Sequence, residues 1–215
     1  PPRQSEPLNY EALLLLDIPI DPMINRGPVN TKALIVMATM FLTREVEIAM
    51  AERSHVEINH KDKTISWLLP VSKTDYKALG CRRSWGCSCT SPSTSGCVYH
   101  TMSSHVDHLS SRFGPPAADD HLPLFPTADG GLVSPETMLE LIELLATMLG
   151  EDLYSKEGRR KYGKRSWRST GAVFLAGIGV DLLKIQLVAR WSSEVITHYS
   201  RLAPLKAITA DFKRA

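Results

Sequence analysis

KRSWRSTGAVFLAGIGVDLLKIQLVARWSSEVITHYSR, residues 164–201, is the stretch that says most about the fold of this chain. It places Arg168, Trp191 and Tyr199 on what the pattern predicts to be consecutive short helices. A guanidinium can bind a phosphate with two parallel hydrogen bonds, an indole N–H can donate a third, and a phenol can act as a nucleophile. One compact segment therefore holds the groups needed to attack a phosphodiester without a metal ion.

A dense basic run precedes and enters this stretch, although the whole chain is almost neutral. The formal net charge of the 215 residues is +2 at pH 7, so total charge alone does not indicate nucleic acid. Between positions 156 and 168, seven lysines and arginines are opposed only by Glu157. Such a run is most often a solvated face or loop, but it can also bind phosphates. We therefore expect DNA contacts from Lys156, Arg159, Arg160, Lys161 and Lys164.

Size and composition favour one domain in a reducing compartment. A chain of 215 residues with 43% hydrophobic residues can build a real core. Its sequence contains no apolar run of transmembrane length, and it starts without the pattern of a secretory signal. All four cysteines lie between positions 81 and 97, whereas a secreted disulfide scaffold would spread them along the chain. These features predict an intracellular protein, in nucleus or nucleoid if it acts on DNA, with no membrane partner.

The first half of the chain predicts a buried helix followed by a small sheet. Residues 1–29 are proline-rich and predict a linker or a remnant. Asn30 is a plausible N-cap for an almost wholly apolar helix, and a second short helix follows to about residue 53. Alternating apolar residues predict two strands around a turn at 59–62, with a third strand near 82–85. The fold class is therefore mainly α with a small antiparallel three-stranded sheet, an α+β fold.

The second half predicts an irregular insertion and then helices. Residues 86–130 are poorly periodic and rich in Ser, Thr, Pro, Cys and His. Ser134 and Pro135 begin a helix that ends at Gly150, and another covers about 166–177. Asp181 caps the next helix. Its expected buried face comprises Leu183, Ile185, Leu187 and Val188. A last short helix carries Tyr199, and residues 204–215 predict a C-terminal helical tail.

Five motif positions in order, carried by four stretches of sequence, give the chain its resemblance to a known family. LTREVE holds Arg44 and Glu47, VSKTD holds Lys73, RSWRSTGA holds Arg165 and Arg168, and ARWSSEVITHY holds Trp191 and Tyr199. Over residues 30–203 this order resembles the catalytic domain of the tyrosine recombinases, or phage integrases. The resemblance implies site-specific DNA recombination or integration, of the kind carried by mobile elements. It also implies double-stranded DNA as partner, a homotetramer on DNA and no cofactor for catalysis.

The resemblance implies a role for each matched residue. Tyr199 would attack the scissile phosphate and form a 3′-phosphotyrosyl link, and Lys73 would protonate the departing 5′-oxygen. Arg44 and Arg168 would hold the phosphate oxygens as charge builds on them. Trp191 would donate its indole N–H to the phosphate or order the tyrosine helix. Glu47 is expected to support Arg44.

Three departures from the family pattern stand beside these matches. Arg165 occupies the place of the histidine in the His-x-x-Arg box, and an arginine cannot act as a general base near neutral pH. Tyr199 lies one residue closer to Trp191 than is usual, which is a rotation of about 100° on a helix. The helical DNA-clamping domain that normally comes first is not in this sequence, so the chain is either a fragment or a member that lost its clamp.

The cysteines predict a separate site. The spacing Cys87-x-Cys89 followed by Cys97-x-x-His100 offers four soft ligands within fourteen positions, which suits a structural zinc ion. The first pair is closer than the usual Cys-x-x-Cys. The alternative is a loose loop with free thiols, and Cys81 is expected to stand outside the cluster.

Three functions remain open on the sequence alone. The first is a DNA strand-exchange enzyme. The second is a DNA-binding relative of the same fold that no longer cuts, which the arginine at position 165 favours. The third is a zinc-stabilised interaction module in which the likeness to recombinases reflects ancestry alone.

Overall fold

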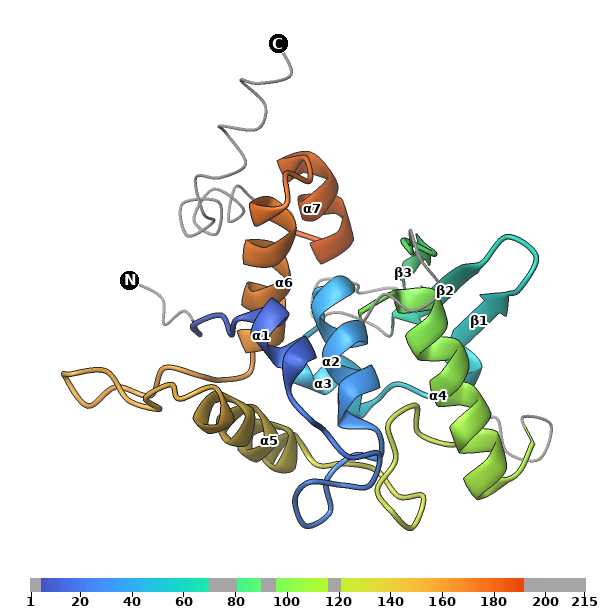
Figure 1. The fold of residues 1–215 in the computed structure, drawn as a ribbon, viewed down its shortest axis with the longest axis horizontal. Coiled ribbons are helices and arrows are strands. Elements are labelled where there is room, and N and C mark those ends of the chain that lie inside the picture. Colours follow the sequence, from blue (N-terminus) through green and yellow to red (C-terminus); the bar gives the residue numbers. More distant parts are fainter. Residues whose placement is uncertain (1–4, 70–80, 90–95, 116–120, 192–215) are drawn as a thin grey trace.

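Helices gathered around a central buried helix, with a three-stranded antiparallel sheet on one side, make up the fold (Figure 1). The computed structural model describes residues 5–69, 81–89, 96–115 and 121–191. The architecture confirms the predicted α+β class. The elements are α1 Tyr10–Leu15, α2 Thr31–Met40, α3 Glu45–Ala49, the 3-10 turn Arg53–His55, β1 Val56–Asn59, β2 Thr64–Leu69, β3 Cys81–Gly86, α4 Val98–Phe113, α5 Pro135–Met148, α6 Ser166–Gly177 and α7 Leu182–Ala189.

The central helix α2 begins where the sequence predicts. Asn30 caps it from a left-handed conformation with φ 55°, and its side chain accepts a hydrogen bond from the backbone N–H of Ala33 at 3.2 Å. Eight of its ten residues are buried, because α1, α4 and α6 all pack against it. A helix that is apolar on almost every side is stable only when covered in this way.

The sheet has the order β1-β2-β3, and both pairs are antiparallel. In β2, Ile65, Trp67 and Leu69 are fully buried and alternate with half-buried neighbours, as the side-chain period of two requires. Trp67 meets Phe41 edge-on, with ring centroids 5.2 Å apart. The sheet is therefore anchored on the end of α2.

The predicted helix starts at Ser134 and Asp181 are confirmed. The Ser134 hydroxyl accepts from the N–H of Thr137, and the Asp181 carboxylate accepts from the N–H groups of Leu183 and Lys184. The predicted buried face of α7 is partly wrong. Ile185 is buried as expected, but Leu183 and Leu187 are 68% and 66% exposed, because only one narrow side of α7 packs on α6.

Residues 1–29 were predicted to be a linker or a remnant, and the described part does not have the exposure of a linker. From residue 5 onward it is part of the core: Leu8, Tyr10 and Leu13 are buried, and α1 packs against α2 and α6. The backbone N–H of Leu8 donates to the hydroxyl of Thr170 on α6 at 2.9 Å. A few well-placed apolar residues anchor this segment despite its prolines.

The predicted irregular insertion at 86–130 is also wrong in part, because α4 fills its middle. The buried side of α4 carries Val98, Met102, His105 and Leu109, spaced for one face of a helix. Three are apolar, and the histidine in the stripe hides the pattern from a reading of the sequence. The predicted tyrosine helix and the tail at 204–215 lie outside the described residues. None of the described helices is both long and apolar enough to cross a membrane.

Candidate active site

Glu47 is the centre of a buried ionic cluster at the start of α3. Its side chain is 3% exposed. One oxygen, Oε2, accepts the backbone N–H of Arg44 at 2.7 Å and lies 3.2 Å from Nη2 of Arg168 and 2.8 Å from Nη2 of Arg190. A buried carboxylate without such partners would be strongly destabilising, so its charge requires the two guanidinium groups.

Arg168 is oriented from two directions. It lies in the first turn of α6 and is 4% exposed. Its Nε donates to the carbonyl oxygen of Leu42 at 2.8 Å, while Nη2 contacts Glu47. Leu42 adopts φ 48°, a left-handed conformation that costs a leucine on the order of 1 kcal/mol, and it stands where the chain leaves α2 for α3. The turn after α2 thus fixes the direction of the Arg168 side chain.

Arg190 is a member of the cluster that the sequence reasoning missed. It is the C-cap of α7, with φ 59° and ψ 39°, and its side chain is 11% exposed. A cation at the C-terminus of a helix is stabilised by the helix dipole, and Arg190 also neutralises Glu47. The available signal was a basic residue directly before Trp191, but periodicity gives no warning that a helix end will turn this side chain inward.

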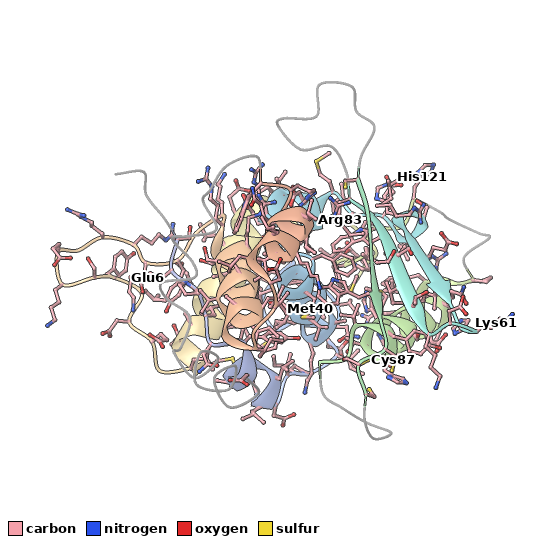
Figure 2. All side chains as sticks on the ribbon, turned by 90° about the horizontal axis from the view of Figure 1, so that it is seen from above. Glu6, Met40, Lys61, Arg83, Cys87 and His121 are labelled. Atoms are coloured by element: carbon pink, nitrogen blue, oxygen red, sulfur yellow. The ribbon has the colours of Figure 1, made fainter. Side chains whose placement is uncertain are left out.

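Arg83 was missed as well, and it joins the sheet to the same helix end. Its Nε and Nη2 donate to the carbonyl oxygen of Leu187 at 3.1 and 2.9 Å. Figure 2 shows Arg83 between the sheet and the helices. Leu69 at the end of β2 pairs with Cys81 at the start of β3, two residues before Arg83.

Trp191 follows directly after Arg190. Its backbone N–H donates to the carbonyl of Gln186 at 3.1 Å, which closes the end of α7. The side chain is half-buried against the small apolar cluster formed by Leu42, Ala172, Leu175, Ile185 and Ala189. Through Leu42, Trp191 shares its packing with the turn that holds Arg168.

The guanidinium groups of the two remaining predicted arginines do not join the ionic cluster in the part of the chain that the structure describes. Arg44 is the half-buried N-cap of α3, and its guanidinium makes no hydrogen bond or ion pair with any residue that the structure describes. Arg165 directly precedes α6 and is exposed, as is Lys164. Burial raises the pKa of Glu45, while Lys164 and Arg44 act in the opposite direction. Lys164 and Arg44 therefore act electrostatically on Glu45, near the paired charges around Glu47.

The basic run divides into two groups. Arg160 forms a two-pronged ion pair with Glu143 of α5, and Lys161 lies 3.4 Å from Glu6 and 3.5 Å from Glu151. Lys156, Arg159 and Lys164 are exposed. The segment between α5 and α6 extends away from the helices (Figure 1), which leaves the second group accessible to a large partner.

Two predicted catalytic residues, Lys73 and Tyr199, lie outside the described residues. Of the other four, the structure brings Arg44 and Arg168 together around Glu47, and it places Trp191 next to the added Arg190. Arg165 stays a prediction, since it reaches no described member of the cluster.

The predicted metal ligands meet at a separate place. Cys87, Cys89, Cys97 and His100 have their ligand atoms within 4.8 Å of one another. Cys81 begins β3, at the opposite end of the strand from Cys87, and so stands outside this cluster as expected.

Comparison with known proteins reveals likeness in fold without likeness in sequence. No protein-family model and no curated protein sequence matches the chain. Among solved structures it is similar to the site-specific recombinase XerH bound to its palindromic difH substrate, with a TM-score of 0.63 and 15% identity over 97% of this chain. It is also similar to XerA recombinase, with a TM-score of 0.59 and 16% identity over 100% of the chain. A third similar structure is the Tn1549 transposon integrase in complex with transposon right end DNA, with a TM-score of 0.51 and 15% identity over 99% of this chain.

These matches establish the fold of a tyrosine recombinase catalytic domain. The chain spans 53% of the XerH structure and 66% of both the XerA and Tn1549 integrase structures. At 15–16% identity the likeness shows the backbone arrangement alone.

Proposed function

We propose that this chain, with the fold of a tyrosine recombinase catalytic domain, cuts and rejoins double-stranded DNA through a covalent link between Tyr199 and a 3′-phosphate. The observation that carries the proposal is the arginine cluster around Glu47. Arg168 and Arg190 come from different helices, yet both point at one carboxylate whose backbone partner is Arg44. Rigid cations placed before the reaction are what stabilisation of a phosphoryl transition state requires.

The proposed reaction is an exchange of one phosphodiester for another. The Tyr199 oxygen attacks phosphorus, the Tyr199 O–P bond forms, and the bond from phosphorus to the 5′-oxygen breaks. Lys73 gives a proton to the departing 5′-oxygen, while Arg44 and Arg168 stabilise the extra charge on the phosphate oxygens. The phosphotyrosyl link retains the energy of the broken phosphodiester, so the 5′-hydroxyl of a second strand can attack it and reverse the step.

The proton of the attacking phenol needs a different acceptor from the one in the family pattern. A phenol has a pKa near 10, and Arg165 cannot accept its proton. In our proposal the proton passes to solvent water, and the cationic side chains of Arg44, Lys164 and Arg165 stabilise the phenolate. The rate should therefore rise with pH through the neutral range more steeply than histidine-assisted cleavage would.

A DNA-binding protein that does not cut is the second candidate. Two observations favour it: arginine replaces the histidine at position 165, and the Arg168 side chain is 5% exposed, with contacts to Leu42 and Glu47. In either case the proposed partner is double-stranded DNA, and an active protein would assemble as a tetramer on two duplexes inside the nucleus or nucleoid, as a mobile element's recombinase would.

Trapping on nicked DNA tests the proposal. The purified chain is incubated with nicked duplexes whose central region is randomised, so that cleavage releases a short fragment and leaves the protein attached. We expect a complex that survives detergent with wild type and with Tyr154→Phe, a control at a 57% exposed tyrosine. Tyr199→Phe should abolish it, and Arg168→Lys should reduce it by about a hundredfold or more. DNA binding without any trapped complex would favour the second candidate.

A further inference from the structure

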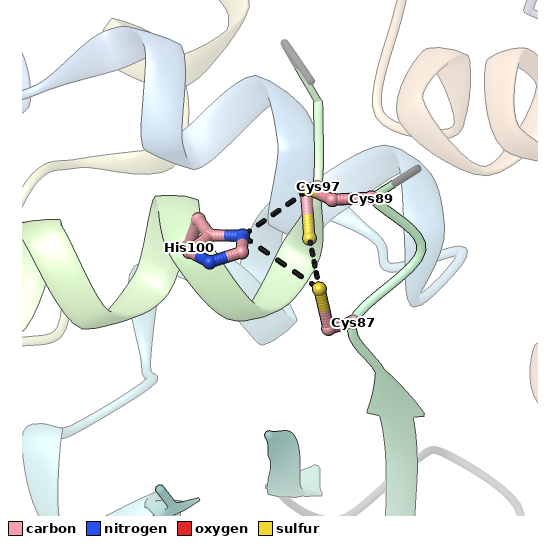
Figure 3. A group of neighbouring side chains, drawn as sticks. All are labelled: Cys87, Cys89, Cys97 and His100. Atoms are coloured by element: carbon pink, nitrogen blue, oxygen red, sulfur yellow. Dashed lines mark hydrogen bonds between the residues drawn. The ribbon is translucent and has the colours of Figure 1, made fainter. Parts of the chain in front are cut away.

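Three cysteines and one histidine come together at the junction between β3 and α4. Cys87 and Cys89 follow the end of β3, Cys97 is the N-cap of α4, and His100 lies in its first turn. Figure 3 shows the four side chains gathered together, with dashed lines between the imidazole of His100 and the cysteines. We propose that these four side chains bind one zinc ion that fixes β3 to α4.

The distances fit a tetrahedral ion. Zinc bonds of about 2.3 Å to sulfur and 2.0–2.1 Å to nitrogen put neighbouring ligand atoms roughly 3.8 Å apart for two sulfurs and roughly 3.6 Å apart for sulfur and nitrogen. The observed separations are 3.8 Å between the sulfurs of Cys87 and Cys97 and 3.8 Å between Cys87 Sγ and His100 Nδ1. Cys89 Sγ lies 3.2 Å from the same nitrogen. All four atoms lie within 4.8 Å of one another.

The donor set favours zinc over a disulfide as the reason these side chains meet. Three thiolates and one imidazole in tetrahedral arrangement are typical of zinc. The sulfurs of Cys87 and Cys97 are 3.8 Å apart, well beyond the bond of about 2.05 Å in a disulfide. A disulfide would also leave the third thiol and the imidazole of His100 without a role.

The surroundings are built to hold the ligands. Cys97 is 1% exposed and part of the main core, and backbone N–H groups of Ser88 and His100 donate hydrogen bonds to its sulfur. Tyr99, between two ligands, bonds through its hydroxyl to Nδ1 of His60 in the β1–β2 turn, at 3.1 Å. The ligand atoms are therefore positioned by the strand, the helix and the hairpin.

The site is structural rather than catalytic. Four protein ligands leave no coordination position open for substrate. The site also lies beyond the Gly86 end of β3. The sheet contacts α7 nearer the Cys81 end, where Arg83 donates to the carbonyl of Leu187 (Figure 2). A bound zinc ion would hold α4, a helix with only a narrow buried stripe, against the sheet. The free energy of zinc binding would then contribute directly to the stability of the fold.

Metal analysis of the purified full chain tests this inference. We expect one zinc per chain in wild type and in Cys81→Ser, the matched control on the same strand. Cys89→Ser and His100→Asn, at partly buried and exposed positions, should lower zinc affinity by more than about tenfold. Replacement of zinc by cobalt in wild type should give the absorption bands of a tetrahedral thiolate complex, which decides the matter even if a variant fails to fold.

Three results would overturn the inference. They are wild type with neither stoichiometric zinc nor a cobalt spectrum, equal zinc content in Cys89→Ser and Cys81→Ser, and a Cys87–Cys97 disulfide in peptide mass spectra. The metal measurement needs no DNA, so a chain without zinc would not count against the proposed strand cleavage. A chain that fails to cut DNA would likewise not count against the zinc site.

Discussion

Glu47 connects folding to chemistry at the scale of single residues. Its carboxylate meets two guanidinium groups and one backbone N–H, so it orients Arg168 while cancelling charge that could not otherwise be buried. The sequence motif predicted that Glu47 supports Arg44. The structure supports this through the backbone of Arg44, and it adds Arg168 and Arg190 as the side-chain partners.

Removal of the Glu47 charge should destabilise the fold. In Glu47→Gln two buried guanidinium groups lose their counterion, and we expect the free energy of unfolding to fall by about 3 kcal/mol in urea denaturation. Glu57→Gln is the control, because Glu57 pairs with Arg82 on the surface, where both side chains are more than half exposed. Equal stability of the two variants would show that the cluster does not hold Arg168 in place.

What the sequence could predict at this scale depends on how each residue is placed. Arg44 and Arg168 lie in short motifs whose order matches the family pattern, and this order predicted that the two residues belong to one site. Arg190 reaches Glu47 only because α7 ends in a left-handed turn. Arg83 reaches the carbonyl of Leu187 only because of the sheet register. Both depend on long-range geometry that no local pattern records.

At the scale of elements, α2 and α6 cross at Gly171. A Cβ placed there would lie 2.0 Å from the carbonyl oxygen of Thr39 and 3.2 Å from Cγ of Leu42. The close approach keeps Arg168, less than one turn earlier on α6, within reach of the Leu42 carbonyl. Helix packing at this point thus sets the geometry of the cluster.

Gly171→Ala should push α6 away from α2. We expect the unfolding free energy to fall by about 2 kcal/mol or more, together with a loss of strand cleavage. Gly86→Ala is the matched control, since its new methyl group would meet only Thr64 Cγ2, at 4.0 Å. Thermal and urea unfolding of both variants check this, and a Gly171→Ala protein as stable as the control would contradict the packing described.

The helix α4 is anchored by a buried histidine, which makes its stability depend on pH. His105 donates from Nε2 to the carbonyl of Leu124 at 2.6 Å and stacks on Phe125. The pKa of His105 is lowered from 6.5 to about 4, chiefly by burial; nearby His108 contributes to the shift, and the hydrogen bond to Leu124 opposes it. Between these values the unfolded chain binds a proton that the folded chain does not.

Stability should therefore fall as the pH drops from about 6.5 to about 4 and change no further through this group below that. The loss attributable to His105 is roughly 3 kcal/mol. Urea unfolding at several pH values should show this slope in wild type and in the control His121→Gln, whose histidine is 88% exposed. In His105→Gln the slope should be smaller, and an unchanged slope would contradict the assignment.

Prediction of the elements from sequence succeeded where one signal dominated. The caps at Asn30, Ser134 and Asp181 and the alternation in the hairpin located helices and strands well. It failed where a polar residue is satisfied by tertiary contacts, as His105 is within α4, or where a few apolar side chains dock a proline-rich segment, as in α1.

At the scale of the whole molecule, the segment between α5 and α6 presents cations to a partner. Lys156, Arg159 and Lys164 are exposed, whereas Arg160 and Lys161 are paired with acidic side chains. The total charge of +2 does not reveal this local excess of positive charge. The close spacing of the basic residues along the sequence does predict it.

Replacement of the three exposed cations by glutamine should weaken DNA binding and flatten its salt dependence. Each lost phosphate contact changes the slope of log affinity against log salt by about one unit, so the triple variant should lose between about two and three units. Arg160→Gln is the comparison. Its slope should change by clearly less than one unit, because Arg160 is held by Glu143. A loss of a full unit in Arg160→Gln, as large as the average loss per cation in the triple variant, would show that the ion pair opens on DNA and that the division into two groups is wrong.

The most direct measurement of the central claim is the identity of the residue that carries DNA after cleavage. Complexes trapped on nicked duplexes are digested with nuclease and protease, and the peptides are analysed by mass spectrometry. We expect a nucleotide attached through its 3′-phosphate to Tyr199. DNA attached to another residue, or cut strands without any attached peptide, would contradict the mechanism proposed for this chain.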